Sequence, residues 1–241
     1  MEIFNVVSAG AARAVVARLL QSLQLEDAGL VVKARYGAVH AMKASVLAGE
    51  AADVVVLTDR LLDELLEKNL VLAGSCRDLG VVGTGIAVRV GLPPCDVGSP
   101  ESLRAALLAC SRVVCPDPAT ATAGKVLLQV LDQLGISSQI LPRLQYCSSG
   151  HEAMAQLARG TGLHEIGVMQ ITEIIACADV LLAGPLPGEL QNTIVYSAAV
   201  AARSASPERA QQFITRLTAQ KDVLRAAGFG DCLGHAETQF L

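Results

Sequence analysis

The sequence predicts an α/β fold in which apolar strands alternate with helices and lie largely parallel in the sheet. Short apolar runs that suit buried strands are repeatedly followed by segments with the helical spacing of apolar residues. Such strand-then-helix units form parallel sheets through right-handed crossovers. The composition agrees, because 52% of the 241 residues are hydrophobic and only 3% are aromatic. The core must therefore be built from aliphatic side chains.

The first part of the chain contains three strand-then-helix units. Gly49 suits the C-terminal cap of the second helix, and Thr58 suits the N-terminal cap of the third. The expected strands are 2–7, 30–36 and 53–57, and the expected helices are 11–25, 39–48 and 60–68.

The pattern continues through the middle of the chain. The expected strands are 81–90, 111–115, 144–147, 166–169 and 193–202. The expected helices begin at 99, 123, 151 and 206, and a last short helix ends at Gly228. Two segments, 81–90 and 191–200, would cross between two groups of units and form a hinge. The sequence therefore predicts two lobes, residues 1–82 with 195–241 and residues 83–194, with a ligand cleft between them.

Four loops of small residues lead out of strands or turns into helix starts. They are residues 8–11, 37–40, 120–124 and 148–151. The first turn of a helix exposes unpaired N–H groups and the positive end of the helix dipole, so such loops converging on a cleft would bind a small anion. Gln170 follows a buried strand, where a polar side chain needs a partner. The residues expected to contact the ligand are Ser8, Gly10, Ala38, Val39, Thr120, Thr122, Ala123, Gly150 and Gln170.

Charge and composition argue against several other partners. The net charge is −4 without runs of Lys or Arg, which disfavours nucleic acid and membrane surfaces. Seven cysteines without a CxxC pair indicate neither a disulfide framework nor a metal site, and no cofactor is expected. The first residues pass directly into a strand pattern without a secretory signal. A cytoplasmic location is therefore expected, or a periplasmic one if the chain has been trimmed.

These segments carry a resemblance to a known family. Residues 7–11, 46–55, 122–124 and 166–170 with Thr172 resemble the periplasmic molybdate-binding proteins, which have the type II periplasmic-binding-protein fold. The resemblance implies that the first ligand serine of the family falls on Gly10, the second on or beside Val39, and the ligand tyrosine on Gln170. It places Ala123 and Gly150 where backbone N–H donors are usual. Three side-chain donors therefore differ from the molybdate pattern.

Aconitate isomerase is a second branch of this resemblance, and it moves a double bond in a tricarboxylate between cis and trans forms. That reaction needs an acid and a base near an allylic carbon. His40 is the first choice of general base, because its unperturbed pKa lies close to working pH, and His151 is the second. Arg13 or Arg35 could reach a carboxylate of the substrate.

Two functions therefore stay open. One is a protein that binds an oxyanion or small carboxylate, related to transporter substrate-binding proteins but without a transporter partner unless it is exported. The other is an isomerase of an unsaturated tricarboxylate. The resemblance as a whole favours the first function, whereas the changed donors and the two histidines favour the second.

Overall fold

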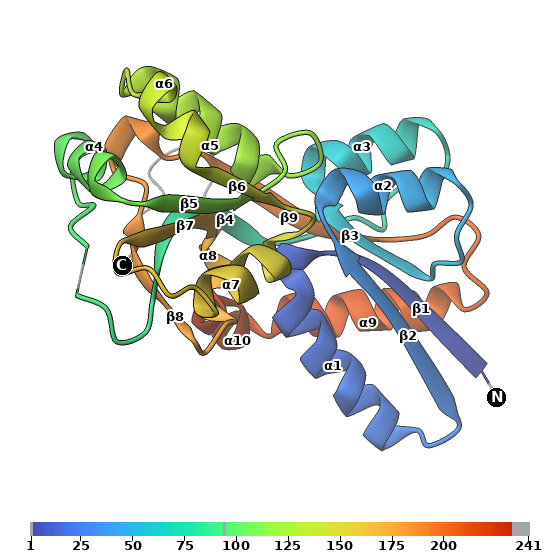
Figure 1. The fold of residues 1–241 in the computed structure, drawn as a ribbon. Coiled ribbons are helices and arrows are strands. Elements are labelled where there is room, and N and C mark those ends of the chain that lie inside the picture. Colours follow the sequence, from blue (N-terminus) through green and yellow to red (C-terminus); the bar gives the residue numbers. More distant parts are fainter. Residues whose placement is uncertain (1, 94, 233–241) are drawn as a thin grey trace. The chain divides into compact units, whose positions relative to one another are not determined.

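A computed structural model describes residues 2–93 and 95–232 of the chain (Figure 1). The chain divides into two compact units, of which the first comprises Met1–Val81 with Ile194–Leu241 and the second Val82–Thr193. It passes between the units twice, within strand β4 (Arg77–Arg89) and at the start of strand β9 (Thr193–Val200). Of the expected first lobe, Met1 and residues 233–241 lie outside the described part of the chain.

The first unit has a mixed sheet between two layers of helices. Strand β1 (Glu2–Ala9) pairs in parallel with β2 (Leu30–Gly37) and β3 (Val54–Thr58), and β9 pairs antiparallel with β3. The order is β2-β1-β3-β9-β4. Its helices are α1 (Arg13–Glu26), α2 (Val39–Leu47), α3 (Asp59–Glu67), α9 (Pro207–Ala219) and α10 (Lys221–Ala226). Figure 1 shows α1 and α9 on one face of the β1–β2 part of this sheet and α2 and α3 on the other.

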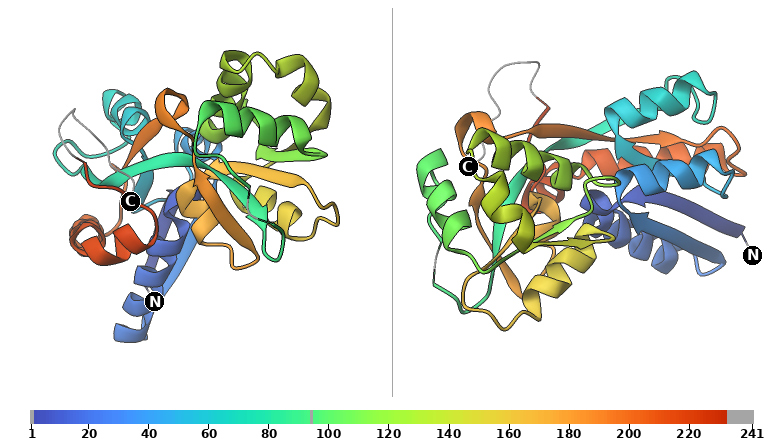
Figure 2. Two further views of the ribbon diagram at one scale, coloured as in Figure 1. Left: turned by 90° about the vertical axis from the view of Figure 1, so that its left-hand side faces the viewer. Right: turned by 45° about the horizontal axis from the view of Figure 1, so that its top comes forward.

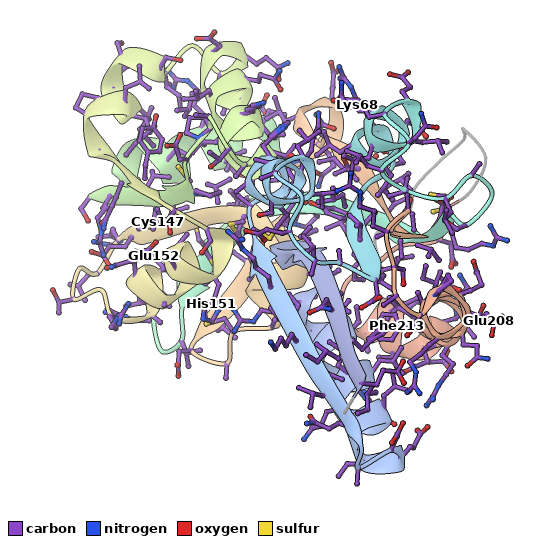
Figure 3. The ribbon with its side chains drawn as sticks, turned by 90° about the vertical axis from the view of Figure 1, so that its right-hand side faces the viewer. Lys68, Cys147, His151, Glu152, Glu208 and Phe213 are labelled. Carbon is purple, nitrogen blue, oxygen red and sulfur yellow. The ribbon has the colours of Figure 1, made fainter. Side chains whose placement is uncertain are left out.

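The core of the first unit is aliphatic, apart from a few aromatic contacts. Phe4 of β1 packs on Phe213 of α9 with ring centroids 5.6 Å apart, and Figure 3 labels Phe213 on that helix. Tyr196 of β9 and Phe229 meet edge to face at 6.4 Å. Valine and leucine supply most of the remaining buried side chains of β1 and β3, as the composition predicts.

Asp53 fastens the start of β3 to the rest of the first unit. Its carboxylate is buried and accepts hydrogen bonds from the Asn5 backbone N–H at 2.7 Å, the Ser204 hydroxyl at 2.7 Å and the Ala205 N–H at 3.1 Å. A buried carboxylate is tolerated only with such partners. The segment 46–55, which carries much of the family resemblance, therefore contains a structural aspartate.

The second unit also has a mixed sheet covered on both faces. Strand β5 (Arg112–Pro116) pairs in parallel with β6 (Leu144–Cys147) and β7 (Glu165–Gln170), whereas β4 pairs antiparallel with β7 and β8 (Val180–Pro185). Its helices are α4 (Pro100–Ala109), α5 (Thr122–Gln133), α6 (Ser137–Ile140), α7 (Gly150–Ala158) and α8 (Ile171–Ile175). Figure 2 shows α4, α5 and α6 on one face and α7 on the other. No helix among the described residues is long and apolar enough to cross a membrane.

The alternation of strands and helices is confirmed, and the differences lie in short or irregular elements. Helix α6 has four residues, too few to show a period. Strand β8 was not expected, because Leu181 and Leu182 are both exposed and break the alternation of a half-buried strand. The first helix starts with a 3-10 turn, Gly10–Ala12, before α1. Sequence periodicity predicts largely parallel sheets. In the structure, strands β4, β8 and β9 pair antiparallel with their neighbours, so both sheets are mixed.

Candidate functional site

The carboxyl ends of three neighbouring strands define one edge of the second unit. Strands β6, β5 and β7 are adjacent and parallel, so the loops that follow them leave from the same edge. The Asp117 N–H donates to the Cys147 carbonyl at 2.9 Å and joins two of these loops. The structure therefore brings together the expected site residues of this unit, namely Thr120, Thr122, Ala123, Gly150, His151 and Gln170.

Three buried polar side chains at this edge have atoms without hydrogen-bond partners. Within the described part of the chain, these are the Thr84 hydroxyl, the Thr172 hydroxyl and both amide atoms of Gln170. Thr84 is 0% exposed, and Gln170 and Thr172 are each 3% exposed. Buried polar atoms are nearly always paired in native proteins, since an unpaired one costs free energy. Their concentration here indicates a place where a ligand supplies the partners.

The two remaining buried polar atoms without partners among the described residues lie away from this edge. Arg112 and Glu165 form an ion pair of 3.0 Å at the opposite, amino-terminal ends of β5 and β7. Each has one further buried atom without a partner, Nε of Arg112 and Oε2 of Glu165. Because the two side chains already neutralise each other, this pair is structural.

Thr84 and Gln170 lie on the same face of the sheet. They are directly opposite each other in the antiparallel pairing of β4 with β7, and opposed residues project to one side. Val168, two residues before Gln170, belongs to the core cluster that includes Val126 and Leu127 of α5. Side chains alternate along a strand. Thr84 and Gln170 therefore project toward the layer that contains α5.

The backbone of Thr84 is held by a side chain. The Thr84 N–H donates to Oε1 of Gln191 at 2.9 Å, and Nε2 of Gln191 donates back to the Thr84 carbonyl at 2.9 Å. The Gln191 side-chain amide thus makes the two hydrogen bonds that a residue of a neighbouring strand would make with the Thr84 backbone. This leaves the Thr84 hydroxyl as the unpaired group of that residue.

The start of α5 lacks the groups that usually cap a helix. Its N-cap residue is Ala121, which has no side-chain acceptor, and its first turn contains no acidic residue. The first N–H groups of a helix have no partner within the helix. The turn lies close to the preceding loop, because a Cβ on Gly124 would come within 2.3 Å of the Pro116 carbonyl oxygen. Glycine is therefore required where α5 approaches the end of β5.

The start of α7 differs from that of α5, because the Glu152 carboxylate already accepts hydrogen bonds there. The Ser149 hydroxyl accepts from the Glu152 N–H at 3.2 Å, and the Glu152 carboxylate accepts from the Ser148 N–H at 3.0 Å and from the Ser148 hydroxyl. These hydrogen bonds from Ser148 lower the pKa of Glu152. Figure 3 shows His151 and Glu152 on this helix, after Cys147 at the end of β6. His151 is exposed.

The carboxyl ends of β1 and β2 bring together the expected site residues of the first unit. Ser8 is opposite Tyr36, and Ala9 is opposite Gly37, so Gly10, Ala38, Val39 and His40 follow from one edge. The 3-10 turn and α2 both begin after an alanine, without a side-chain cap or an acidic residue in the first turn. The buried Ser8 hydroxyl donates to the Ala9 carbonyl at 3.0 Å.

The charged groups near His40 come from α2 and α3. Glu64 of α3 pairs with Lys43 of α2. The pKa of Glu64 is lowered chiefly by the hydrogen bond from Lys43, and Arg60 and His40 act in the same direction. His40 therefore lies within electrostatic range of this carboxylate. His151 belongs to the other unit, and the role of either histidine as a general base stays a prediction.

The two arginines proposed to reach a carboxylate differ. Arg35 is exposed and forms an ion pair with Glu50. Arg13 begins α1 and lies over the ring of Tyr36 at 5.2 Å from its centroid. Burial raises the pKa of Tyr36, and Arg13 acts against that rise. Arg13 thus stays at the edge where the site residues of the first unit gather.

Sequence reasoning missed Thr84, Tyr36 and Gln191. Thr84 lies within an apolar run that predicts a strand, and a threonine among glycines and valines is the only local signal of its position. Gln191 acts on Thr84 from 107 residues away, which no local pattern reveals. The described residues contain no group of three or more His, Cys, Asp or Glu side chains that could hold a metal ion.

The fold is that of the periplasmic binding proteins. A model of the family described as bacterial extracellular solute-binding protein matches residues 4–230, and the chain belongs to this family. It is similar in structure to the periplasmic molybdate-binding protein of Azotobacter vinelandii, with 20% identity, a TM-score of 0.78 and coverage of 94% of this chain and 98% of that one. The sulfate-binding protein SubI from Mycobacterium tuberculosis has 17% identity, a TM-score of 0.73 and coverage of 96% and 88%.

A curated relative adds an enzyme to these comparisons. The chain is 29% identical over 177 residues to an aconitate isomerase from Pseudomonas sp. That match covers 73% of this chain and 65% of the length of the relative. The comparisons confirm the periplasmic-binding-protein fold expected from the sequence and the resemblance to both branches.

Proposed function

We propose that this protein binds a small anion at the carboxyl edge of the second unit. The observation that carries the proposal is the set of unpaired buried atoms on Thr84, Gln170 and Thr172 next to the uncapped start of α5. Membership in a solute-binding family and structural neighbours named for molybdate and sulfate binding support it.

An anion suits this edge for two reasons. The first turn of α5 has no acidic residue, so its N–H groups and the helix dipole favour negative charge. The hydroxyls and the Gln170 amide add donors without adding charge. The start of α7 gives an internal comparison, since the Glu152 carboxylate already accepts hydrogen bonds from Ser148 there.

Thermal unfolding in the presence of candidate anions tests the proposal. The panel is molybdate, tungstate, sulfate, phosphate, citrate, cis-aconitate and trans-aconitate. A ligand at about 100 times its dissociation constant adds about 2.7 kcal/mol of stability, which for a chain of this length raises the melting temperature by about 5–10 °C. A rise with one class of anion supports the proposal and identifies the class. The absence of any rise across the panel contradicts it.

An isomerase of an unsaturated tricarboxylate is the second candidate, and the likeness to an aconitate isomerase favours it. In such a reaction a base removes a proton from one end of an allylic system and an acid returns a proton to the other, with no net change in composition. His40 is the proposed base. Its position at the start of α2, near Glu64, gives it a group that can stabilise the protonated imidazole.

Conversion of cis-aconitate to trans-aconitate tests the second candidate. If the protein is an isomerase, His40→Ala abolishes turnover while the thermal shift with aconitate remains. His164→Ala is the control, because His164 is exposed and precedes β7 at the opposite edge of the sheet. No turnover by the unaltered protein removes this candidate. The cytoplasmic location and the lack of a transporter partner stay predictions.

A further inference from the structure

We infer that the anion bound by this protein carries its own hydrogen-bond donor, as a hydroxycarboxylate or a protonated oxyanion does. This inference rests on the proposed function and narrows its ligand class. A fully ionised anion such as sulfate, molybdate or aconitate offers only acceptors. The Gln170 amide accounts for this requirement.

Gln170 needs both a donor and an acceptor. Its amide nitrogen can only donate and its amide oxygen can only accept. Both atoms are buried and neither has a partner within the described residues. The requirement does not depend on which way the amide is oriented, because a flip exchanges the two atoms and leaves one of each kind. An ion that has only acceptors can satisfy the nitrogen but not the oxygen.

The neighbouring polar side chains do not meet the need of the amide oxygen. Thr84 is directly opposite Gln170 in the pairing of β4 with β7, and its hydroxyl is unpaired. The Thr172 hydroxyl, two residues after Gln170, is also unpaired. The start of α5 contributes further N–H donors, which serve acceptors on the ligand. A ligand with anionic oxygens and one O–H group therefore matches the site, with the O–H directed to the Gln170 oxygen.

Gly85 allows the start of α8 to approach β4 closely. A Cβ at Gly85 would come within 2.9 Å of Ile171 Cγ1 and 2.7 Å of Leu182 Cδ1. The start of α8 thus packs directly on the backbone of β4, next to Thr84. Thr84 and Thr172 are held by elements that contact each other within this unit.

Matched pairs of ligands that differ in one O–H group test the inference. The pairs are citrate with propane-1,2,3-tricarboxylate, malate with succinate, and hydrogenphosphate with sulfate, measured by calorimetric titration of the full chain. In the pair that binds, we expect the donor-bearing member to bind at least about 10-fold more tightly, because its partner leaves a buried acceptor unpaired. A response to citrate or malate identifies a hydroxycarboxylate, and a response to phosphate alone identifies a protonated oxyanion.

A variant of Gln170 tests whether this residue causes the preference for ligands that carry an O–H group. Gln170→Met has a similar length and removes both amide groups, so the preference within the binding pair should fall to about 3-fold or less. Gln133→Met, an exposed glutamine of α5, is the matched control and should keep the preference. Retention of the full preference by Gln170→Met overturns the assignment to this residue.

The outcomes separate this inference from the proposed function. Equal or tighter binding of the donor-free members by the unaltered protein overturns the inference while the proposed function stands. Binding of molybdate, tungstate or aconitate alone, with no member of any pair bound, overturns the inference while the proposed function stands. Failure of every pair together with the absence of a thermal shift across the anion panel contradicts the proposed function, and the inference with it. Because the comparison of ligands uses the unaltered protein, it decides the inference even if Gln170→Met fails to fold.

Discussion

Thr84 and Gln170 are directly opposite each other on strands β4 and β7, and each carries a buried polar group without a partner. Two such side chains in register on one face are costly to a protein that has no use for them. Natural proteins retain such costs at functional sites. Removal of one of these polar groups should therefore raise the stability of the protein without ligand and weaken its binding of the anion.

Replacement of Thr84 by valine tests this prediction. Thr84→Val keeps the shape and removes the unpaired hydroxyl, so the free energy of unfolding without ligand should rise by about 1 kcal/mol. The melting-temperature rise caused by the anion should shrink in the same variant. Chemical denaturation with and without the anion measures both effects.

A second threonine provides the control. The Thr58 hydroxyl accepts from the Leu61 N–H at 3.4 Å and caps α3. Thr58→Val should lower stability by about 1 kcal/mol, because it removes that cap. If Thr84→Val also lowers the stability of the unliganded protein, the Thr84 hydroxyl has a structural partner and the prediction is wrong.

Gln191 should act on the site through the backbone of Thr84. Gln191→Leu leaves the Thr84 N–H without its partner and removes one of the two donors to the Thr84 carbonyl, which also accepts from the Leu186 N–H at 3.0 Å. We therefore expect a loss of about 1–2 kcal/mol in stability together with weaker anion binding. Gln129→Leu changes an exposed glutamine of α5 and should leave both nearly unchanged. Normal binding by a destabilised Gln191→Leu protein would limit Gln191 to a role in folding.

Two glycines of the second unit separate the position of α5 from stability in general. Gly124→Ala places a Cβ 2.3 Å from the Pro116 oxygen and should cost about 1–3 kcal/mol while displacing the start of α5. Gly135→Ala strains a residue at φ +66°, with no atom near the new Cβ, and should cost about 1–2 kcal/mol. Anion affinity, measured by titration well below both melting temperatures, should fall only for Gly124→Ala. Equal affinities would show that the start of α5 does not contact the anion.

The pairing of Glu26 with Arg216 should give a pH dependence in the acid range. The hydrogen bond from Arg216 lowers the pKa of Glu26 from 4.5 to about 2, with a smaller contribution from Ser22. Because the folded-state pKa is depressed, the stabilisation is present above about pH 4.5 and is lost as the pH falls through about 2.

Melting temperatures of the unaltered protein and Glu26→Gln across this range measure the effect. The difference between them should be small, because both side chains are exposed, and it should shrink toward low pH and in high salt. A difference that persists unchanged at about pH 2 would assign it to packing rather than to the ion pair.

Local sequence patterns were sufficient for most elements of the fold. The strand at 144–147 and the caps of α3 and α4 follow from residues that lie next to each other in the chain, such as Ser99 and Ser102 of the capping box. Strand β8 could not be found this way, because its pairing with β4 is set by residues about 95 positions earlier.

The candidate site was only partly accessible from the sequence. Gln170 stood out because it is polar at the end of a buried strand. Thr122 and Ala123 stood out because they belong to a loop of small residues that leads into a helix. Thr84 did not stand out, since an isolated threonine in an apolar run is common in strands. Its importance comes from being opposite Gln170 and held by Gln191, and both relationships depend on the tertiary fold.

Nuclear magnetic resonance of the labelled protein during titration with an anion tests the central claim most directly. The measurement follows the backbone amides of Thr122, Ala123 and Gly124 and the side-chain amide of Gln170 as citrate, or the anion with the largest thermal shift, is added. Binding at the carboxyl edge of the second unit predicts that these four groups shift together and saturate with one dissociation constant. Saturating shifts elsewhere, with these four unchanged, would contradict the claim.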